Sequence, residues 1–242
     1  MKHKQDVGSD FIYGLHTVTA VMAYQPNRCK KLFIARKSAT GTLVDLAEKN
    51  HLAVELVERQ WLEKKFGVGS DAQGVVLQCA PFPYADFDEL KDRANTLFVL
   101  DSWQDPVNLG RAARAALCFA VDGIVICQDR AAQISGASEK SAVGALAEIP
   151  VARVVNLAAA LKKLKESGFF VYGADEHGSV PINLCDFSRR RALVVGQEGE
   201  GLRELTKKNC DVLVSIPMAK PGICLNAADA ALIIAYQLAS PK

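Results

Sequence analysis

The chain has 242 residues, of which half are hydrophobic and 23% are charged, and its formal net charge is +2. This composition is typical of a globular protein, and the length predicts one large domain or two unequal ones. The longest apolar stretch, ALIIAYQLA, is too short to span a bilayer, and the first ten residues lack the apolar run of a signal peptide. We therefore expect no membrane segment and a cytoplasmic location.

Seven cysteines and four histidines are scattered singly along the chain, without a Cys-x-x-Cys pair. Neither residue type shows the spacing of zinc ligands, so we expect buried reduced thiols and no metal site. The net charge is +3 over residues 1–84 and −1 over residues 85–242. This asymmetry favours the N-terminal part as the contact for a polyanion, although ordinary surface variation accounts for it equally well.

The first part of the chain predicts a compact α-β-α-β-α-β unit. Apolar spacing indicates a helix around Val18, Val21 and Met22, and later elements at 30–36, 42–49, 52–58, around Trp61 and Phe66, and at 74–80. The segment APFPYAD then breaks every pattern, because it holds two prolines in three residues. We place a domain boundary near Pro83, which divides the chain into domains 1–83 and 84–242.

The second part alternates apolar strands with helices. Strands are expected at 96–102, 122–128, 151–155, 169–175, 191–198 and 211–218, with helical stretches such as 109–120 and 157–168 between them. Unbroken apolar strands of this kind predict an α/β fold with a mainly parallel sheet that is covered on both faces. Ligands of such sheets bind at the carboxyl ends of the strands, where three unusual loops are found.

The first loop is DSWQDPVNLGRAAR. Asp105 and Pro106 predict a turn, Asn108 is expected to cap the next helix, and Arg111 and Arg114 lie three residues apart on one side of that helix. A capped helix with two solvated arginines is the simpler interpretation of the same residues.

The second loop is VVGQEGEGL, in which Gly196, Gly199 and Gly201 surround Glu198 and Glu200. Glycines at this density suit a tight turn whose backbone approaches a ligand. The spacing is neither that of a dinucleotide fingerprint nor that of a phosphate-binding loop, which disfavours a nicotinamide-dependent dehydrogenase. Two acidic residues favour an uncharged or cationic cofactor, and a purely structural turn stays open.

The third loop is SIPMAKPGICLNAADAALIIAYQL. Asn226 precedes a helix that is apolar nearly all round, so we expect that helix to be buried.

Taken together and in this order, NLGRAAR, VVGQEGEGL and IPMAKPGICLNAADAA resemble the three signature motifs of the SpoU RNA 2′-O-methyltransferases. The segment DFIYGLHTVTAVMAYQPNRCKKLFIAR resembles the opening of the substrate-binding domain of the 23S rRNA guanosine-2′-O-methyltransferase subgroup. The resemblance implies a methyltransferase domain with a deep trefoil knot, preceded by a small α/β substrate-binding domain. It also implies S-adenosylmethionine as cofactor, RNA as substrate, and a homodimer with residues of both subunits near each active site.

Site residues follow from the resemblance position by position. It implies that the functional polar side chains are Asn108, Arg114, Glu198 and Asn226. It implies that the cofactor pocket is lined by backbone at Gly196, Ile216, Met218 and Leu225.

The third motif departs from the family pattern at three places. Cys224 stands where serine is usual, and Ala227-Ala228 stand for the usual Val-Ser. Asp229 adds a carboxylate to an apolar helix, so we expect it to find a basic partner near the site or across the dimer.

Two roles for Arg114 are open. The family proposal makes it the acceptor of the hydroxyl proton, but a guanidinium is a poor base. We favour an Arg114 that grips the adjacent phosphate and stabilises the developing alkoxide, while the proton leaves through Glu198 or water.

The target RNA is less well defined by the sequence. Basic residues that could contact phosphate are Lys30, Lys31, Arg36, Lys37 and the run Arg189 to Arg191, although groups of this kind are more often solvated surface. A tRNA enzyme of the same family and a non-catalytic RNA-binding paralogue are the alternatives. Naked 23S rRNA and an assembling ribosomal particle both stay open as the form of the substrate.

Overall fold

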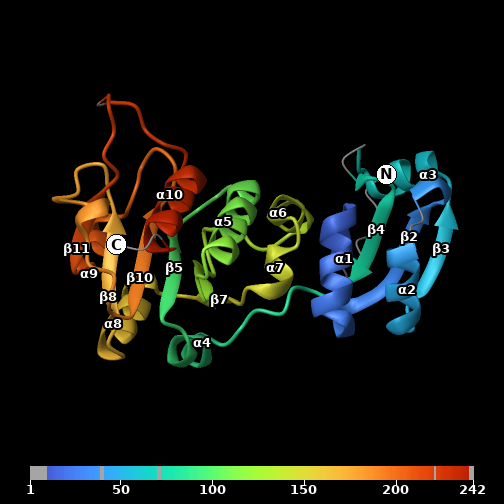
Figure 1. The fold of residues 1–242 in the computed structure, drawn as a ribbon, viewed down its shortest axis with the longest axis horizontal. Coiled ribbons are helices and arrows are strands. Elements are labelled where there is room, and N and C mark those ends of the chain that lie inside the picture. The colour runs from blue at the N-terminus through green and yellow to red at the C-terminus, as the bar shows by residue number, and fades with distance from the viewer. Residues whose placement is uncertain (1–9, 39–40, 70–71, 221, 240–242) are drawn as a thin grey trace. The chain divides into compact units, whose positions relative to one another are not determined.

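The computed structural model describes residues 10–38, 41–69, 72–220 and 222–239 (Figure 1). The chain forms two compact units. Unit 1 comprises residues 1–83 and an insert, residues 134–148, and unit 2 comprises residues 84–133 and 149–242. The chain therefore passes between the units three times. No helix in the described ranges combines the length and apolar character needed to cross a membrane.

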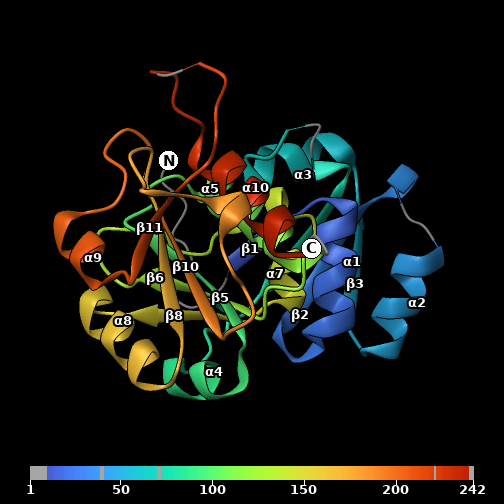
Figure 2. The same cartoon turned by 60° about the vertical axis from the view of Figure 1, so that its left-hand side comes forward.

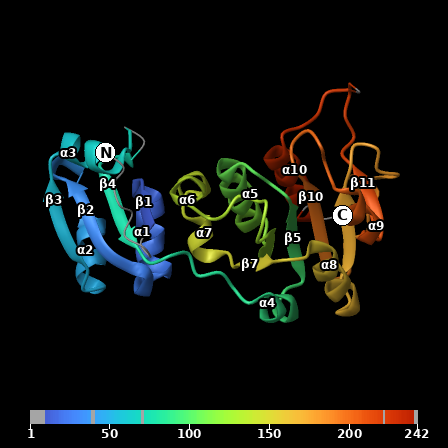
Figure 3. The same cartoon turned by 180° about the vertical axis from the view of Figure 1, so that it is seen from behind.

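Unit 1 contains a mixed four-stranded sheet with helices. In chain order its elements are β1 (Asp10–Tyr13), α1 (Leu15–Tyr24), η1 (Pro26–Arg28), β2 (Cys29–Ala35), η2 (Arg36–Ser38), α2 (Gly41–Lys49), β3 (Ala53–Val57), α3 (Arg59–Phe66), β4 (Val75–Cys79), α6 (Gly136–Ala142) and α7 (Ala145–Glu148). The strand order is β1-β4-β2-β3, where β2 and β3 run parallel and the other pairs run antiparallel (Figure 3).

Alternation along the strands gives this sheet two buried faces. Ile12, Leu32 and Leu77 belong to a cluster with apolar residues of α1 and α2. Phe33 and Val76 point the other way, into a cluster with residues of α3. All six predicted elements are present, and β1 is the strand that sequence analysis missed. The insert was expected in the second domain, whereas the structure packs α6 and α7 with unit 1.

Unit 2 is built on a seven-stranded sheet. Its elements are α4 (Phe87–Arg93), β5 (Thr96–Asp101), α5 (Pro106–Cys118), β6 (Gly123–Cys127), β7 (Val151–Val154), α8 (Leu157–Glu166), β8 (Phe170–Ala174), β9 (Val180–Pro181), η4 (Ile182–Leu184), β10 (Arg191–Gly196), α9 (Glu204–Asn209), β11 (Val212–Ser215) and α10 (Ala227–Ala239). The strand order is β7-β6-β5-β10-β8-β11-β9, and every pairing is parallel. The predicted α/β architecture is confirmed, while the knot stays a prediction.

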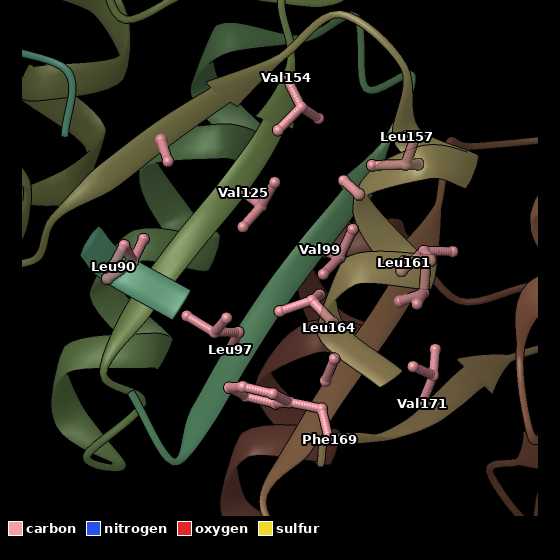
Figure 4. Close-up of a cluster of buried hydrophobic side chains, with 14 of the residues drawn as sticks. Leu90, Leu97, Val99, Val125, Val154, Leu157, Leu161, Leu164, Phe169 and Val171 are labelled. Carbon is pink, nitrogen blue, oxygen red and sulfur yellow. The ribbon is translucent and has the colours of Figure 1, made fainter. Parts of the chain in front are cut away.

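Helices cover both faces of this sheet. Leu157, Leu161 and Leu164 of α8 pack on Val99 and neighbouring strand residues in a fully apolar cluster (Figure 4). Helix α4 lies beside α8 on this face (Figure 2), and a Lys163–Asp88 ion pair joins the two helices. On the opposite face α5 and α10 pack against each other. Helix α5 also packs against β6, and α10 also packs against β10.

Helix α10 was expected to be buried, and this prediction holds for only one of its faces. Ala231, Ile234 and Ala235 are buried against unit 2, but Leu232 and Tyr236 are 45% and 59% exposed. A helix on the outside of a single sheet layer can bury only the stripe that faces the sheet, so its remaining apolar residues stay open in the single chain.

Candidate active site

The three motif loops meet at one edge of the unit 2 sheet. Strands β5 and β10 are neighbours, and β11 lies two strands from β10 in the same parallel sheet. Their carboxyl ends, at Asp101, Gly196 and Ser215, therefore lie along one edge. Each end continues directly into one of the motifs.

Glu198 is the point at which the motifs join. The amide nitrogen of Asn108 donates a hydrogen bond of 2.6 Å to Glu198 Oε1, and the amide nitrogen of Asn226 donates to the same oxygen. Oxygen Oε2 accepts no hydrogen bond from the described residues. Three of the four predicted polar residues are thus brought together, and one carboxylate oxygen is left for a proton or a substrate group.

The capping role predicted for Asn108 is wrong. Asp105 caps α5, because its carboxylate accepts a hydrogen bond from Val107 N at 2.8 Å and Pro106 occupies the first helical position. Asn108 lies inside the first turn and is buried, which directs its amide at Glu198. Asn226 does cap its helix, since its side-chain oxygen accepts from Ala228 N at 2.8 Å.

Glycines fold the loop that carries Glu198 tightly back on itself. A Cβ atom at Gly196 would lie 2.1 Å from the carbonyl carbon of Gly201, so only glycine fits there. Gly199 and Gly201 adopt positive φ angles of 82° and 67°. Gly201 N donates to Gln197 O at 3.0 Å and closes the turn. The predicted tight turn is confirmed.

An ion pair with a buried carboxylate holds the end of this loop, and sequence analysis did not find it. Asp101 is fully buried, and its carboxylate accepts from Arg203 N at 3.2 Å and from the Arg203 guanidinium at 2.6 Å. Ser102 Oγ donates to the same carboxylate at 3.0 Å. Partial burial acts to lower the pKa of Arg203, but the contacts with Asp101 outweigh it and raise that pKa.

A cleft opens beside Glu198. All four predicted cofactor-binding residues, Gly196, Ile216, Met218 and Leu225, line it. Acidic residues also line it, namely Asp175, Glu176, Glu198 and Glu200.

Two acids of the cleft have a basic neighbour, because Asp175 pairs with Lys207 at 2.8 Å and Glu176 lies 3.4 Å from His177 Nε2. Burial acts to raise the pKa of Asp175, but the Lys207 ammonium and His177 N–H outweigh burial and hold that pKa below its ordinary value. The carboxylates of the cleft suit a ligand with a positive charge, and its apolar wall suits a ligand with an apolar body.

A second, smaller cleft adjoins the first. Glu198, Gln197 and Ala227 line both, and the second is completed by Trp103, Gln104, Asp105 and Asn108. Trp103 is fixed there by a hydrogen bond of 2.9 Å from its indole nitrogen to Val195 O. Glu198 therefore lies where the two clefts meet.

Arg114 is the predicted polar residue that the structure does not bring to Glu198. It is exposed on α5 and lines neither cleft. Arg111, one turn earlier, forms an ion pair with Asp229 of α10. The basic partner expected for Asp229 is therefore Arg111 of the same chain.

Cys224 and Cys118 are exposed, contrary to the expectation of buried thiols, while Cys79, Cys127 and Cys185 are buried. The Cys224 thiol donates to Glu176 at 3.5 Å, and this hydrogen bond to a carboxylate raises the pKa of the thiol. Within the described residues, no group of three His, Cys, Asp or Glu side chains is arranged to hold a metal ion.

Several basic residues that were candidates for RNA contact have structural partners. Lys31 pairs with Glu55 at 2.7 Å, and Arg36 pairs with Glu58 at 3.3 Å. Arg190 donates to the carbonyl oxygens at the ends of α4 and α8, so its side chain connects these two helices. The side chain of Lys37 lies outside the described part of the structure.

Comparison with known proteins identifies both parts of the chain. The model of the SpoU rRNA Methylase family matches residues 95–236, and that of RNA 2′-O ribose methyltransferase substrate binding matches residues 11–85. The chain belongs to the SpoU family. It is an RNA ribose 2′-O-methyltransferase, in a family whose methyl donor is S-adenosylmethionine.

Relatives of this SpoU chain cover nearly its whole length. It is 32% identical to the 23S rRNA (guanosine-2′-O-)-methyltransferase RlmB of Escherichia coli, over 95% of this chain and 97% of that protein. It is 38% identical to an uncharacterized tRNA/rRNA methyltransferase of Synechocystis, of which it covers 62%. The crystal structure of the SpoU methyltransferase AviRb from Streptomyces viridochromogenes with AdoMet shares the fold, with a TM-score of 0.81 at 23% identity over 96% of this chain and 90% of that one.

Proposed function

We propose that this SpoU enzyme methylates a guanosine ribose of 23S rRNA in the cytoplasm, with S-adenosylmethionine as methyl donor. The observation that carries the proposal is the convergence of Asn108, Glu198 and Asn226 between two adjoining clefts. Similarity over almost the full length of the Escherichia coli 23S rRNA enzyme supports the choice of substrate.

The larger cleft fits the cofactor. Its apolar wall includes Ile216, Met218 and Leu225, and its carboxylates suit a positively charged sulfonium. Gly196 leaves backbone, with no side chain, at the floor of the cleft. When bound, S-adenosylmethionine supplies an activated methyl group, so the protein has to orient the acceptor hydroxyl and handle its proton.

In this proposal Glu198 handles that proton. Two amide donors fix its Oε1, and Oε2 is open to a substrate hydroxyl or to water. Asn108 and Asn226 are held by burial in α5 and by the cap of α10, so they position the carboxylate and do not transfer protons. Positioning of reacting groups can contribute up to about 7 to 11 kcal/mol in well-oriented systems.

In this proposal the Arg114 guanidinium binds the phosphate next to the target ribose and stabilises the developing negative charge. It does so in the active site of the partner subunit. Arg111, Arg114 and Leu117 follow one side of α5, and Asp229, Leu232 and Tyr236 follow one side of α10. The Arg111–Asp229 pair joins the two helices at this side.

The apolar part of this surface, Leu117, Leu232, Ile233 and Tyr236, is exposed by 36 to 59%. Exposed apolar area of this kind marks an interface. We propose that the α5–α10 surface joins two copies of the chain in a homodimer. Arg114 lies at the edge of this surface, from which it can reach across.

The first test is transfer of labelled methyl from S-adenosylmethionine to separated 23S rRNA, 16S rRNA and tRNA. Wild type should label 23S rRNA ribose, and Arg114→Ala should lose about 10²- to 10³-fold in kcat/KM, as when one charge-stabilising donor is removed. Arg93→Ala, an exposed arginine of α4 at the amino end of β5, is the matched control and should leave activity unchanged.

The outcomes separate the alternatives. Label in tRNA would overturn the substrate but keep the chemistry. No label in any separated RNA, despite measurable cofactor binding, would favour a pre-ribosomal particle as the substrate. No cofactor binding at all would favour a non-catalytic paralogue.

Arg114→Lys separates the two roles of this residue. A lysine that acts as base introduces a new titration into the pH dependence of kcat/KM, whereas a lysine that holds phosphate does not. We expect no new titration.

Mixing two inactive variants tests the shared site. Arg114→Ala and Glu198→Ala subunits, exchanged at equal concentration, form mixed dimers in which one site has Glu198 from one chain and Arg114 from the other. If Arg114 acts across the interface, about a quarter of the wild-type sites recover, because about half of the dimers are mixed and each has one intact site. No recovery, with mixed dimers confirmed by mass spectrometry, would place Arg114 in its own subunit's site.

A further inference from the structure

Unit 1 carries an aromatic cluster that reaches the surface at α3. Phe66 lies 4.9 Å from Phe11, 5.0 Å from Phe33 and 6.2 Å from Trp61, measured between ring centroids. Phe33 is only 3% exposed, but Trp61 is 39% exposed. The phenylalanines thus support α3 from below. Phe11 and Phe66 are half-buried, and Trp61 is the exposed ring of the cluster.

A lysine lies against the same ring. The Lys65 ammonium lies 4.4 Å from the Trp61 centroid and 5.0 Å from the Phe33 centroid. It follows Trp61 by one helical turn, and it forms no ion pair with a carboxylate of the described residues. Lys65 is therefore held in place by aromatic rings and keeps its hydrogen-bonding capacity for another partner.

The charge around α3 is positive. Arg59 pairs with Glu63, and Lys31 pairs with Glu55, so these four side chains cancel. Lys64 and Lys65, in the last turn of the helix, add two charges. Neither forms an ion pair with a described carboxylate, and Lys65 lies close enough to Glu55 to help lower the pKa of that carboxyl. The exposed face of α2 carries Asp45, Glu48 and Lys49 instead, which leaves it with a net negative charge.

We propose that Trp61 and Lys65 form a binding site for unpaired RNA, in which a nucleobase stacks on the indole and the ammonium contacts the adjoining phosphate. This inference rests on the proposed function, because it supplies the contact by which unit 1 holds the RNA that unit 2 methylates. A rigid aromatic ring beside a cation is one arrangement by which proteins recognise single-stranded RNA. A paired base is already stacked on both sides, so the site selects loops and bulges over duplex.

The test measures affinity for a single-stranded uridine-rich RNA oligonucleotide and for a duplex of the same length, by fluorescence anisotropy. Trp61→Ala should weaken single-strand binding roughly 5- to 150-fold, which corresponds to the contribution of one stacked base, and Trp61→Phe should recover part of it. Lys65→Gln should lower the salt dependence of binding by about one counterion. Duplex binding should change little in each variant.

Matched controls are available on the other face of the same sheet. Tyr24, at the end of α1, is an aromatic residue that is 59% exposed, and Lys49 ends α2 as Lys65 nears the end of α3. Tyr24→Ala and Lys49→Gln should bind RNA as the wild type does. Circular dichroism checks that every variant is folded.

Fluorescence gives a second measurement. The chain has two tryptophans, and Trp103 is only 4% exposed, so RNA that stacks on Trp61 should quench the emission that Trp61→Phe removes. If Trp61→Ala binds the single strand like Tyr24→Ala, or if RNA leaves the emission unchanged, the inference is overturned. A Trp61→Ala defect seen only with ribosomal particles and not with RNA would also overturn it, in favour of a protein contact.

Failure of the inference is distinct from failure of the proposed function. Wild type that binds RNA through Trp61 but methylates none keeps the stacking site and removes the proposed reaction. Wild type that methylates 23S rRNA while Trp61→Ala keeps full affinity removes the stacking site alone.

Discussion

Both units bury a carboxylate beside an arginine, and the two pairs differ in their access to solvent. In unit 1 the side chains of Arg28 and Glu139 are 4% and 2% exposed. In unit 2 Asp101 is fully buried, but the side chain of Arg203 is 51% exposed. The first pair is sealed and can only hold structure together, whereas the second anchors a loop that opens onto the two clefts.

The sealed pair fastens the insert to unit 1. Arg28 donates to both Glu139 oxygens, at 3.1 and 2.6 Å, and its third nitrogen donates to Ala80 O at 2.8 Å. Gln25 adds hydrogen bonds to the carbonyl oxygens of α7. Gly136 approaches β1 so closely that a Cβ atom there would lie 2.6 Å from Phe11 O.

The largest effect on stability is expected from Glu139→Ala. Removal of the carboxylate leaves Arg28 buried without its partner, which should cost about 3 to 5 kcal/mol in the free energy of unfolding. Hydrogen exchange measured by mass spectrometry should show the loss of protection in β2 and β4, with β5 and β10 unchanged. Equal loss in both units would contradict the assignment of the insert to unit 1.

Glu55→Ala is the matched control for that experiment. It breaks the Lys31–Glu55 pair of the same unit, whose side chains are 40% and 39% exposed. An exposed pair contributes about 0.2 to 1 kcal/mol, so the control should be nearly as stable as the wild type.

An intermediate effect is expected from Asp101→Asn, which keeps the shape of the side chain but loses the charge that holds Arg203. An amide nitrogen then faces a donor of Arg203, so the loop that carries Glu198 loosens. We expect kcat/KM to fall by a factor that corresponds to about 1 to 3 kcal/mol of transition-state stabilisation. We expect KM for S-adenosylmethionine to rise, because the loop also forms a wall of the larger cleft.

The control here is Asp88→Asn, which breaks the exposed Asp88–Lys163 pair of α4 and α8 and should leave both constants unchanged. An Asp101→Asn enzyme with wild-type kinetics would show that the loop keeps its shape without the pair.

The smallest effect is expected for the pair Arg111–Asp229, whose side chains are 47% and 44% exposed. A double-mutant cycle on the free energy of unfolding should give a coupling of about 0.2 to 1 kcal/mol. A coupling well above that range would mean that the pair is desolvated in solution, as it would be under a partner subunit. The protein would then hold a third kind of ion pair, one that is buried at a subunit interface.

Much of the fold is predictable from local patterns. Six strands of unit 2 follow from unbroken apolar runs, and the alternating elements of unit 1 follow from periodicity and one proline-rich break. What was missed is short or non-local. Strand β9 has only two residues, and the membership of residues 134–148 in unit 1 depends on contacts with residues more than a hundred positions earlier.

The part of the candidate site that belongs to the three sequence motifs was predictable. Glycines, asparagines and Glu198 stand in recognisable runs, so their convergence could be expected. Asp101 and Arg203 could not be paired in this way, because 102 residues separate them and neither belongs to a spacing pattern. The place of Arg114 outside both clefts could not be foreseen either, since helical spacing gives the side of α5 but not what that side meets.

The distant origin of Glu139 also bears on synthesis of the protein. Arg28 leaves the ribosome 111 residues before Glu139 does. During that interval β5 and β6 of unit 2 emerge, while an arginine destined for burial waits without Glu139, the closer of its two carboxylate partners. Folding of unit 1 during translation is therefore completed only when unit 2 is partly made, and a chimaera that exchanges this unit between relatives must carry residues 134–148 with it.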